Sequence, residues 1–131
     1  MDMTEAELRA ASDQFYERLA DVLVGDATSM LELWSESDDI SYLGPGGEYL
    51  VGRAAIEQTW RDQAANKFGG SASPQENHFV VAGPLGVVVG YERGIVMLDG
   101  QEQDLEIRAT STYRKEDDGT VRMIGHHTDR F

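Results

Sequence analysis

Three residues in the C-terminal half of the chain have side chains suited to moving a proton or stabilising an anion. His127 is the best candidate for proton transfer, because only histidine normally titrates near neutral pH. The planar guanidinium of Arg93 suits a carboxylate or enolate oxygen. Tyr91, two residues earlier, can donate a hydrogen bond to developing negative charge. The set predicts proton-transfer chemistry.

Each of these residues also has a purely structural interpretation. Arg93 could pair with Asp129 or Asp39, and His127 could be a hydrogen-bonded histidine at the edge of the core. An arginine that faces an apolar interior needs a partner in either case, since an unpaired buried charge is costly. The residue types alone leave both interpretations open.

The histidines do not have the spacing of a metal site. His126 and His127 are adjacent, and neighbouring side chains on a strand point to opposite faces, so one ion cannot easily bind both. We therefore expect His126 on the outer face or at an interface. The chain has no cysteine, which excludes thiolate sites. Its turns GPGG and GPLG lack the Lys-Ser/Thr of a phosphate-binding loop. We expect neither a metal nor a cofactor.

The elements that must position these residues are helices in the first half of the chain and strands in the second. Thr4 and Glu7 form a capping-box pattern at the start of a helix that Gly25 ends, and a short helix follows Asp26. We expect a hairpin within 40–51, a third helix over 53–67, and strands over 77–82, 85–98, 105–113 and 121–128. This order predicts an α+β fold, in which a curved antiparallel or mixed sheet wraps around three helices as a cone.

Length and charge narrow the class of protein. The chain has 131 residues, and we expect one domain over residues 1–131. Its net charge of −13 argues against nucleic acid and anionic membrane surfaces as partners. No apolar run reaches the ~18 residues that cross a bilayer, and the N-terminus lacks the pattern of a signal peptide. We expect an acidic, cytoplasmic protein.

Several short motifs resemble those of one superfamily. The first half of the chain resembles SnoaL-like and ketosteroid isomerase-like domains of the nuclear transport factor 2-like superfamily, in Gly25-Asp26 through Leu33-Trp34, Pro45-Gly46, Gly52-Arg53 and Ile56. The second half is similar to the association domain of calcium/calmodulin-dependent kinase II, in Tyr91, Arg93, Tyr113, Asp118-Gly119 and His127. The resemblance spans nearly the whole chain and implies a cystatin-like α+β barrel with an internal pocket.

The chain departs from the isomerase pattern where the chemistry would take place. Gly44 stands before Pro45, where ketosteroid isomerases have the aspartate that moves the proton. The tyrosine of their first helix would fall near Arg18, with Tyr16 about half a turn away. Val121 stands where an aromatic residue usually follows Asp-Gly-x. Steroid isomerisation by the family mechanism is therefore not expected, and whether the chain is an enzyme at all stays open.

The resemblance also implies which residues line the pocket. It places the arginine of the Tyr-x-Arg strand on the concave side, and strand alternation then puts Tyr91 and Val89 there as well. The same alternation groups His127 with Met123 on the last strand, and Tyr113 with Ser111 on the strand before it. The predicted ligand-binding residues, beside catalytic Arg93, His127 and Tyr91, are Trp34, Tyr42, Trp60, His78, Val89, Tyr113 and Met123.

Two functions follow from this interpretation. The first is a SnoaL-like domain that binds a small apolar or aromatic ligand and, if it is an enzyme, acts as a cofactor-free isomerase, cyclase or dehydratase. The second is a non-catalytic dimerisation or ligand-sensing domain. In both cases we expect a homodimer through the outer face of the sheet, with Arg108, Thr110, Thr112, Arg122, Ile124 and His126 at the interface.

Overall fold

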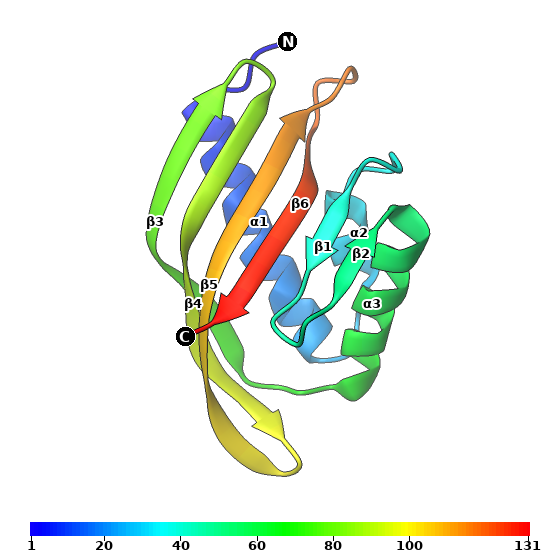
Figure 1. The fold of residues 1–131 in the computed structure, drawn as a ribbon, viewed down its shortest axis with the longest axis vertical. Coiled ribbons are helices and arrows are strands. Elements are labelled where there is room, and N and C mark those ends of the chain that lie inside the picture. Colours follow the sequence, from blue (N-terminus) through cyan, green and yellow to red (C-terminus); the bar gives the residue numbers. More distant parts are fainter.

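The computed structural model describes residues 1–131 and places three helices against one curved sheet (Figure 1). The helices are α1 (Glu5–Leu23), α2 (Thr28–Leu33) and α3 (Arg53–Asn66). The strands are β1 (Ser41–Leu43), β2 (Tyr49–Val51), β3 (Ser71–Ala82), β4 (Leu85–Leu98), β5 (Gln101–Lys115) and β6 (Val121–Arg130). The predicted element order is confirmed.

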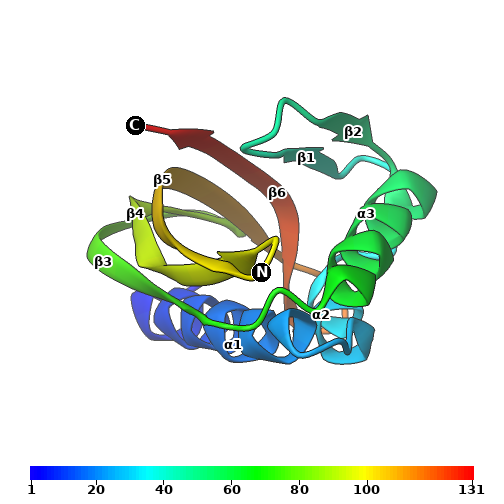
Figure 2. The same cartoon turned by 90° about the horizontal axis from the view of Figure 1, so that it is seen from below.

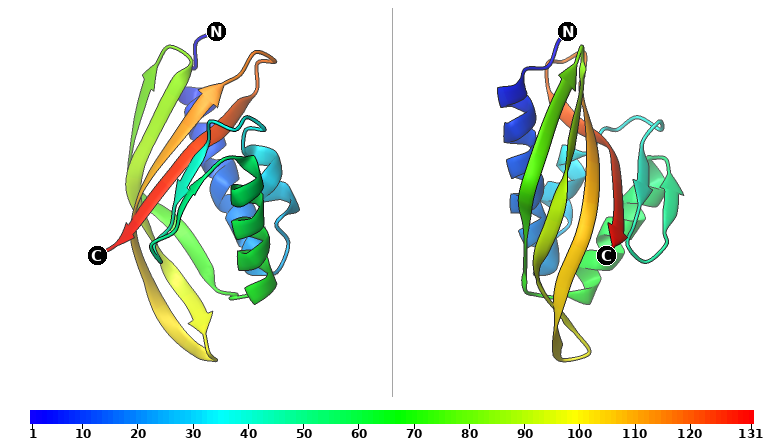
Figure 3. Two further views of the ribbon diagram at one scale, coloured as in Figure 1. Left: turned by 45° about the vertical axis from the view of Figure 1, so that its right-hand side comes forward. Right: turned by 60° about the vertical axis from the view of Figure 1, so that its left-hand side comes forward.

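The six strands form one mixed sheet in the order β2-β1-β6-β5-β4-β3. Only β1 and β6 run parallel, with Tyr42 opposite His126, and every other pair is antiparallel. The sheet stays open, because β2 and β3 are unpaired on their outer sides. The predicted α+β architecture, a curved sheet around three helices, is confirmed, and the views of Figures 2 and 3 show how the sheet curves over α1 while α3 lies beside it.

Strand β3 begins at Ser71, well before the predicted start at residue 77. The segment GGSASPQ contains Pro74 and reads as a strand breaker, but proline is tolerated on an edge strand, where its missing N–H faces no partner. The pairing with β4 slips between Gln75 and His78, where Glu76 has a φ of 58°. The edge position of β3, which the sequence does not reveal, is the reason for the difference.

Helix α1 crosses the concave face of the sheet and is fixed at its start by the predicted capping box. The backbone N–H of Glu7 donates to the Thr4 hydroxyl at 3.1 Å, and the N–H of Thr4 donates to the Glu7 carboxylate at 2.9 Å. The helix lies so close to β4 that a Cβ at Gly86 would be 2.6 Å from Met3 Sδ and 2.8 Å from Leu8 Cδ1. No helix of the protein is both long and apolar enough to span a membrane.

A single cluster of apolar side chains joins the helices to the sheet. Its largest fully buried members come from every layer of the fold: Phe15 from α1, Trp60 from α3, Tyr113 from β5, Met123 from β6, and Trp34 directly after α2. The aromatic rings meet at the centre, with Phe15 and Tyr42 6.2 Å and 5.6 Å from Trp60 between ring centroids. Toward the end of the cone where α3 finishes, this packing gives way to a cavity.

Candidate functional site

A cavity of about 440 Å³ lies between the concave face of the sheet, the ends of α1 and α3, and the turn between β1 and β2. This volume is within the range of small-molecule sites. Its walls are largely apolar and aromatic, with a few polar side chains among them. The lining residues used below are Phe15, Tyr42, Glu48, Trp60, Asp62, Glu92, His126 and Arg130.

Glu92 is the most unusual group on the cavity wall. It projects inward from the middle of β4, and only 4% of its surface is exposed. Tyr16, on α1, donates a hydrogen bond to its Oε2 at 3.0 Å. Burial raises the pKa of Glu92 to about 7, although the hydrogen bond from Tyr16 acts in the opposite direction. The carboxyl group can therefore gain or lose a proton near neutral pH.

His126 faces Glu92 from β6. Its Nδ1 is 2.8 Å from the Ser111 hydroxyl, and its Nε2 is 4.0 Å from Oε2 of Glu92, which is too long for a direct hydrogen bond. Burial, with a smaller effect from neighbouring His127, lowers the pKa of His126 to about 3, so the ring is neutral and forms no ion pair with Glu92. The ring packs 4.7 Å from Phe15, between centroids.

Burial and the charge of Glu92 together raise the pKa values of the tyrosines around this carboxyl group. Burial, followed by the charge of Glu92, raises the pKa of Tyr16 and of Tyr113 well above the ordinary range. Burial raises the pKa of Tyr42 to about 12, with further increases from Glu48 and Glu92 and an opposing hydrogen bond from Gln63 at 3.2 Å. These hydroxyls stay protonated at neutral pH, and Glu92 is the group among them that titrates there.

The predicted orientation of the three catalytic candidates is wrong. Tyr91 and Arg93 lie on the outer face of β4, where the Arg93 guanidinium is 4.3 Å from the centre of the Tyr91 ring and donates to Gln75 at 3.0 Å. Asp129 and Asp39, its alternative predicted partners, pair instead with Arg108 and Arg114. His127 is exposed.

Two local features reverse the predicted faces. On β4 the interior side carries glycines as well as Val88 and Glu92, because α1 leaves no room for larger side chains at Gly86, so the more apolar side of this strand is the outer one. On β6 the pairing with β5 skips Ile124, and this bulge changes the alternation after Met123. His126 consequently points inward, contrary to its predicted outward position.

The predicted ligand-binding residues divide into three groups. Tyr42 and Trp60 line the cavity. Trp34, Tyr113 and Met123 are buried in the core behind it, with at most 1% of each exposed. Val89 and His78 are exposed on the outer face and do not contact the cavity. A shallow depression there, of about 390 Å³, brings Tyr91, Val89 and His127 together beside the ion pair of Arg108 and Asp129.

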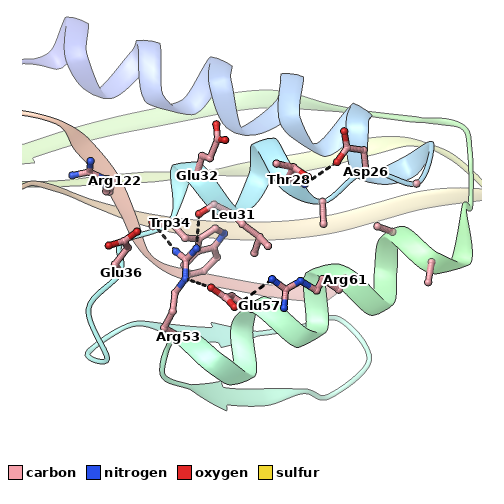
Figure 4. A pocket seen from close by; sticks show the side chains of 14 residues that line it. Asp26, Thr28, Leu31, Glu32, Trp34, Glu36, Arg53, Glu57, Arg61 and Arg122 are labelled. Atoms are coloured by element: carbon pink, nitrogen blue, oxygen red, sulfur yellow. Dashed lines mark hydrogen bonds and ion pairs between the residues drawn. The ribbon is translucent and has the colours of Figure 1, made fainter.

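A larger groove of about 780 Å³ runs between α2 and α3, but its arginines are paired within the fold (Figure 4). Arg53 donates to Glu57 at 2.8 Å and to the backbone carbonyl oxygens of Leu31 and Trp34, both at 2.9 Å. Arg61 lies 3.5 Å from the second oxygen of Glu57. These contacts join α3 to the end of α2, so the groove is a structural junction and the cavity is the better candidate site.

Sequence reasoning missed Glu92, His126, Tyr16 and Ser111 as a group. One signal was available: Gly86, Gly90 and Glu92 alternate on β4, and glycines on a strand can mark the close approach of another element. No sequence signal indicates the bulge at Ile124, on which the orientation of His126 depends.

Replacing Tyr16 with Phe tests the contact that holds Glu92. The hydrogen bond stabilises the charged carboxylate, so the Tyr16→Phe variant should have a Glu92 pKa about one pH unit higher. A ¹³C NMR titration of the side-chain carboxyl group measures this directly. Tyr49→Phe, at an exposed position on β2, is the matched control. An unchanged or lower Glu92 pKa in Tyr16→Phe would contradict the assignment.

The raised pKa of Glu92 also makes a prediction about stability. The folded protein holds this proton up to about pH 7, whereas the unfolded chain releases it near 4.5. The free energy of unfolding that protonated Glu92 contributes is therefore lost as pH rises from 4.5 to about 7. From pH 5 to pH 8 the unfolding free energy of Glu92→Gln should rise relative to wild type by about 2 kcal/mol. Urea denaturation at each pH measures it. Glu106→Gln, an exposed carboxylate on β5, should show no such trend, and a Glu92→Gln difference that does not vary with pH would reject the raised pKa.

Comparison with known proteins identifies the family of the chain and structures with a similar fold. The model of the SnoaL-like domain matches residues 8–128. A candidate dehydratase of the nuclear transport factor 2-like family from Streptomyces avermitilis is 21% identical, with a TM-score of 0.83 over 96% of this chain and 95% of that one. A candidate ketosteroid isomerase from Shewanella frigidimarina is 15% identical, with a TM-score of 0.74 over 92% of each chain.

A third similar structure is a candidate calcium/calmodulin-dependent protein kinase type II association domain from Thiobacillus denitrificans. It is 25% identical, with a TM-score of 0.74 over 94% of each chain. No curated protein matches the chain by sequence. The SnoaL-like model covers nearly the whole sequence and the cone-shaped fold agrees with it, so the protein belongs to the SnoaL-like domain family.

Proposed function

We propose that the protein binds a small apolar or aromatic molecule in its cavity and transfers a proton to or from it without a cofactor, as an isomerase, cyclase or dehydratase does. The observation that carries the proposal is Glu92, an inward carboxyl group on an apolar cavity wall with its pKa raised to about 7. A general acid or base is most effective when its pKa is close to the working pH, and clustered perturbed groups in a cavity favour a catalytic site.

In the proposed reaction, ionised Glu92 accepts a proton from a carbon next to a carbonyl group and returns it at another position. The bond from carbon to hydrogen breaks, its electron pair moves toward the carbonyl oxygen, and the proton resides on Glu92. Tyr16 holds the carboxyl group in place from α1. Glu92 thus takes the proton-transfer role predicted for His127, and His126 takes the anion-stabilising role predicted for Arg93, since both face the cavity.

His126 is proposed to stabilise the oxygen on which negative charge develops. If Ser111 donates its hydroxyl proton to Nδ1, the ring proton resides on Nε2, the nitrogen on the side of Glu92. A neutral imidazole has one N–H group, and this group can donate a hydrogen bond to a ligand oxygen. Dehydratases and ketosteroid isomerases, two of the activities named among the similar structures, both catalyse reactions that move protons.

Hydrogen exchange at a carbon acid tests this function without knowledge of the natural substrate. The probe is 2-tetralone in D₂O, and ¹H NMR follows the loss of its α-protons. Wild type should accelerate exchange, and Glu92→Gln should lower the rate about 10²- to 10⁴-fold. Glu106→Gln, on the outer face, should exchange like wild type.

Two results would reject the proposed function. One is exchange by Glu92→Gln at the wild-type rate. The other is a wild type that neither accelerates exchange nor shows chemical-shift changes at Trp60 or His126 on titration with 2-tetralone. Circular dichroism of Glu92→Gln establishes that the variant is folded, so that loss of exchange reports on the carboxyl group alone.

A second candidate function, self-association, is favoured by the outer face of the sheet. Val80, Val89, Ile95 and Met97 expose 47%, 37%, 41% and 37% of their surfaces there, which is an apolar set on adjacent strands. We propose that two copies pair through this face. Of the predicted interface residues, Arg108 and Thr110 lie on the exposed side of β5, but His126 does not.

Light scattering coupled to size exclusion tests the association. Wild type should elute as a dimer at tens of micromolar, and Val89→Glu should elute as a monomer, because a charge would be buried at the centre of the apolar set. Val51→Glu, an exposed valine on β2, serves as the control. A monomeric wild type at that concentration would rule the interface out.

A further inference from the structure

We infer that the ligand of the cavity carries a positive charge, as a protonated amine on an apolar or aromatic body. The inference uses the same cavity as the proposed function and adds the charge of its ligand. It stands on three observations: the sign of the charged groups on the wall, the absence of an arginine or lysine paired with its carboxyl groups, and the aromatic rings that share the wall.

The carboxyl groups on the cavity wall outnumber the cations. Glu48, Asp62 and Glu92 line it, and the one cation is Arg130, an exposed residue at the end of β6. The remaining titratable ring, His126, is neutral at physiological pH. An anionic ligand would meet this negative wall, and the net charge of −13 would oppose its approach as well.

No arginine or lysine pairs with any of these three carboxyl groups. Elsewhere the protein uses its cations efficiently: Arg53 and Arg61 share Glu57, and Arg114 contacts Asp39. With 24 acidic and 11 basic residues, many carboxyl groups elsewhere in the chain also lack a basic partner, and those of the cavity differ from them in lying together on one cavity wall. A cation supplied by a ligand would give them the partner that the chain does not provide.

The glycines of the β1–β2 turn leave space for the Glu48 side chain at the cavity wall. A Cβ at Gly44 would collide with the Glu48 carboxyl group and lie 2.9 Å from Cε1 of Tyr42, and a Cβ at Gly46 would lie 3.4 Å from Cδ of Glu48. The missing side chains make room for this carboxyl group beside the Tyr42 ring. Gly44 thus leaves space for the Glu48 carboxyl group, at the position where the resemblance to ketosteroid isomerases would place an aspartate.

Three aromatic rings complete a site for a cation. Phe15, Tyr42 and Trp60 all line the cavity, and the centre of the Trp60 ring is 6.2 Å from that of Phe15 and 5.6 Å from that of Tyr42. Aromatic faces attract ammonium groups, and the attraction is stronger in a desolvated site. Rings with carboxylates at their margin are suited to a protonated amine and unsuited to a carboxylate.

Binding of such a ligand should be linked to ionisation of Glu92. A cation in the cavity favours the charged carboxylate, so the amine should bind more tightly as pH rises through about 7. The groups that face Glu92 are Tyr16 from α1, Tyr42 from β1, Tyr113 from β5 and His126 from β6. None of them titrates between pH 6 and pH 8, because their pKa values are moved away from that range.

Three probes with one ring system and different charges test the inference. They are 2-(aminomethyl)naphthalene, 2-(hydroxymethyl)naphthalene and 2-naphthoic acid, titrated into the wild-type protein by calorimetry at pH 6 and pH 8. The amine should bind at least tenfold more tightly than the alcohol at pH 8, and the acid should bind most weakly. The affinity of the amine should increase several-fold between the two pH values, while that of the alcohol should not.

Glu48→Gln/Glu92→Gln should remove the preference for the amine and its pH dependence but retain binding of the alcohol. Glu17→Gln, an exposed carboxylate on α1, controls for net charge and should behave like wild type. Equal affinities for amine and alcohol in wild type, or a preference that survives in the double variant, would overturn the inference and leave the proposed function standing. Binding of none of the three probes would overturn both.

Discussion

The contact between α1 and β4 constrains the rest of this protein. Helix α1 lies so close to the concave face that Gly86 has no space for a side chain beside Leu8, and about two helical turns further on Tyr16 reaches the Glu92 carboxyl group at 3.0 Å. A buried carboxyl group is unfavourable unless it is hydrogen-bonded or neutral. The cavity exists where the helices diverge from the sheet beyond this point, and the acid stands at the boundary between the packed core and the open space.

The two ends of the cone are built differently. At the end that contains the β5–β6 turn, Arg114 contacts Asp39 and Glu116, and Ser35 donates to Glu116 at 2.7 Å, so the loop after α2 is joined to the sheet by paired charges. At the other end, where α3 finishes and the β4–β5 hairpin extends (Figure 1), the carboxyl groups of the cavity have no such partners. Paired charges lie at one end of the cone, and carboxyl groups without a basic partner lie at the other.

Glu92 and His126 have opposite effects on how the stability of the fold depends on pH. Each group is buried in its neutral form. Glu92 therefore favours the folded state at low pH, where its carboxyl group is protonated. His126 favours the folded state at high pH, because below its ordinary pKa unfolding is accompanied by protonation of the ring. A core of apolar residues would avoid both costs. Retention of two such groups around a cavity is typical of sites in which stability is exchanged for function.

The sequence by itself determined the element order, the capping of α1, the extent of β4 and the α+β architecture, because helical and strand periodicities and turn residues are local signals. It also identified Tyr42 and Trp60, whose large aromatic side chains lie inward in this fold. Only the tertiary structure decided which face of β4 and β6 is inside. On β4 the choice depends on the close approach of α1, which requires a glycine at the inward position 86. On β6 it depends on one skipped residue at Ile124, which turns His126 inward and His127 outward. Both effects arise from contacts between distant segments, and a pattern read along one strand does not contain them.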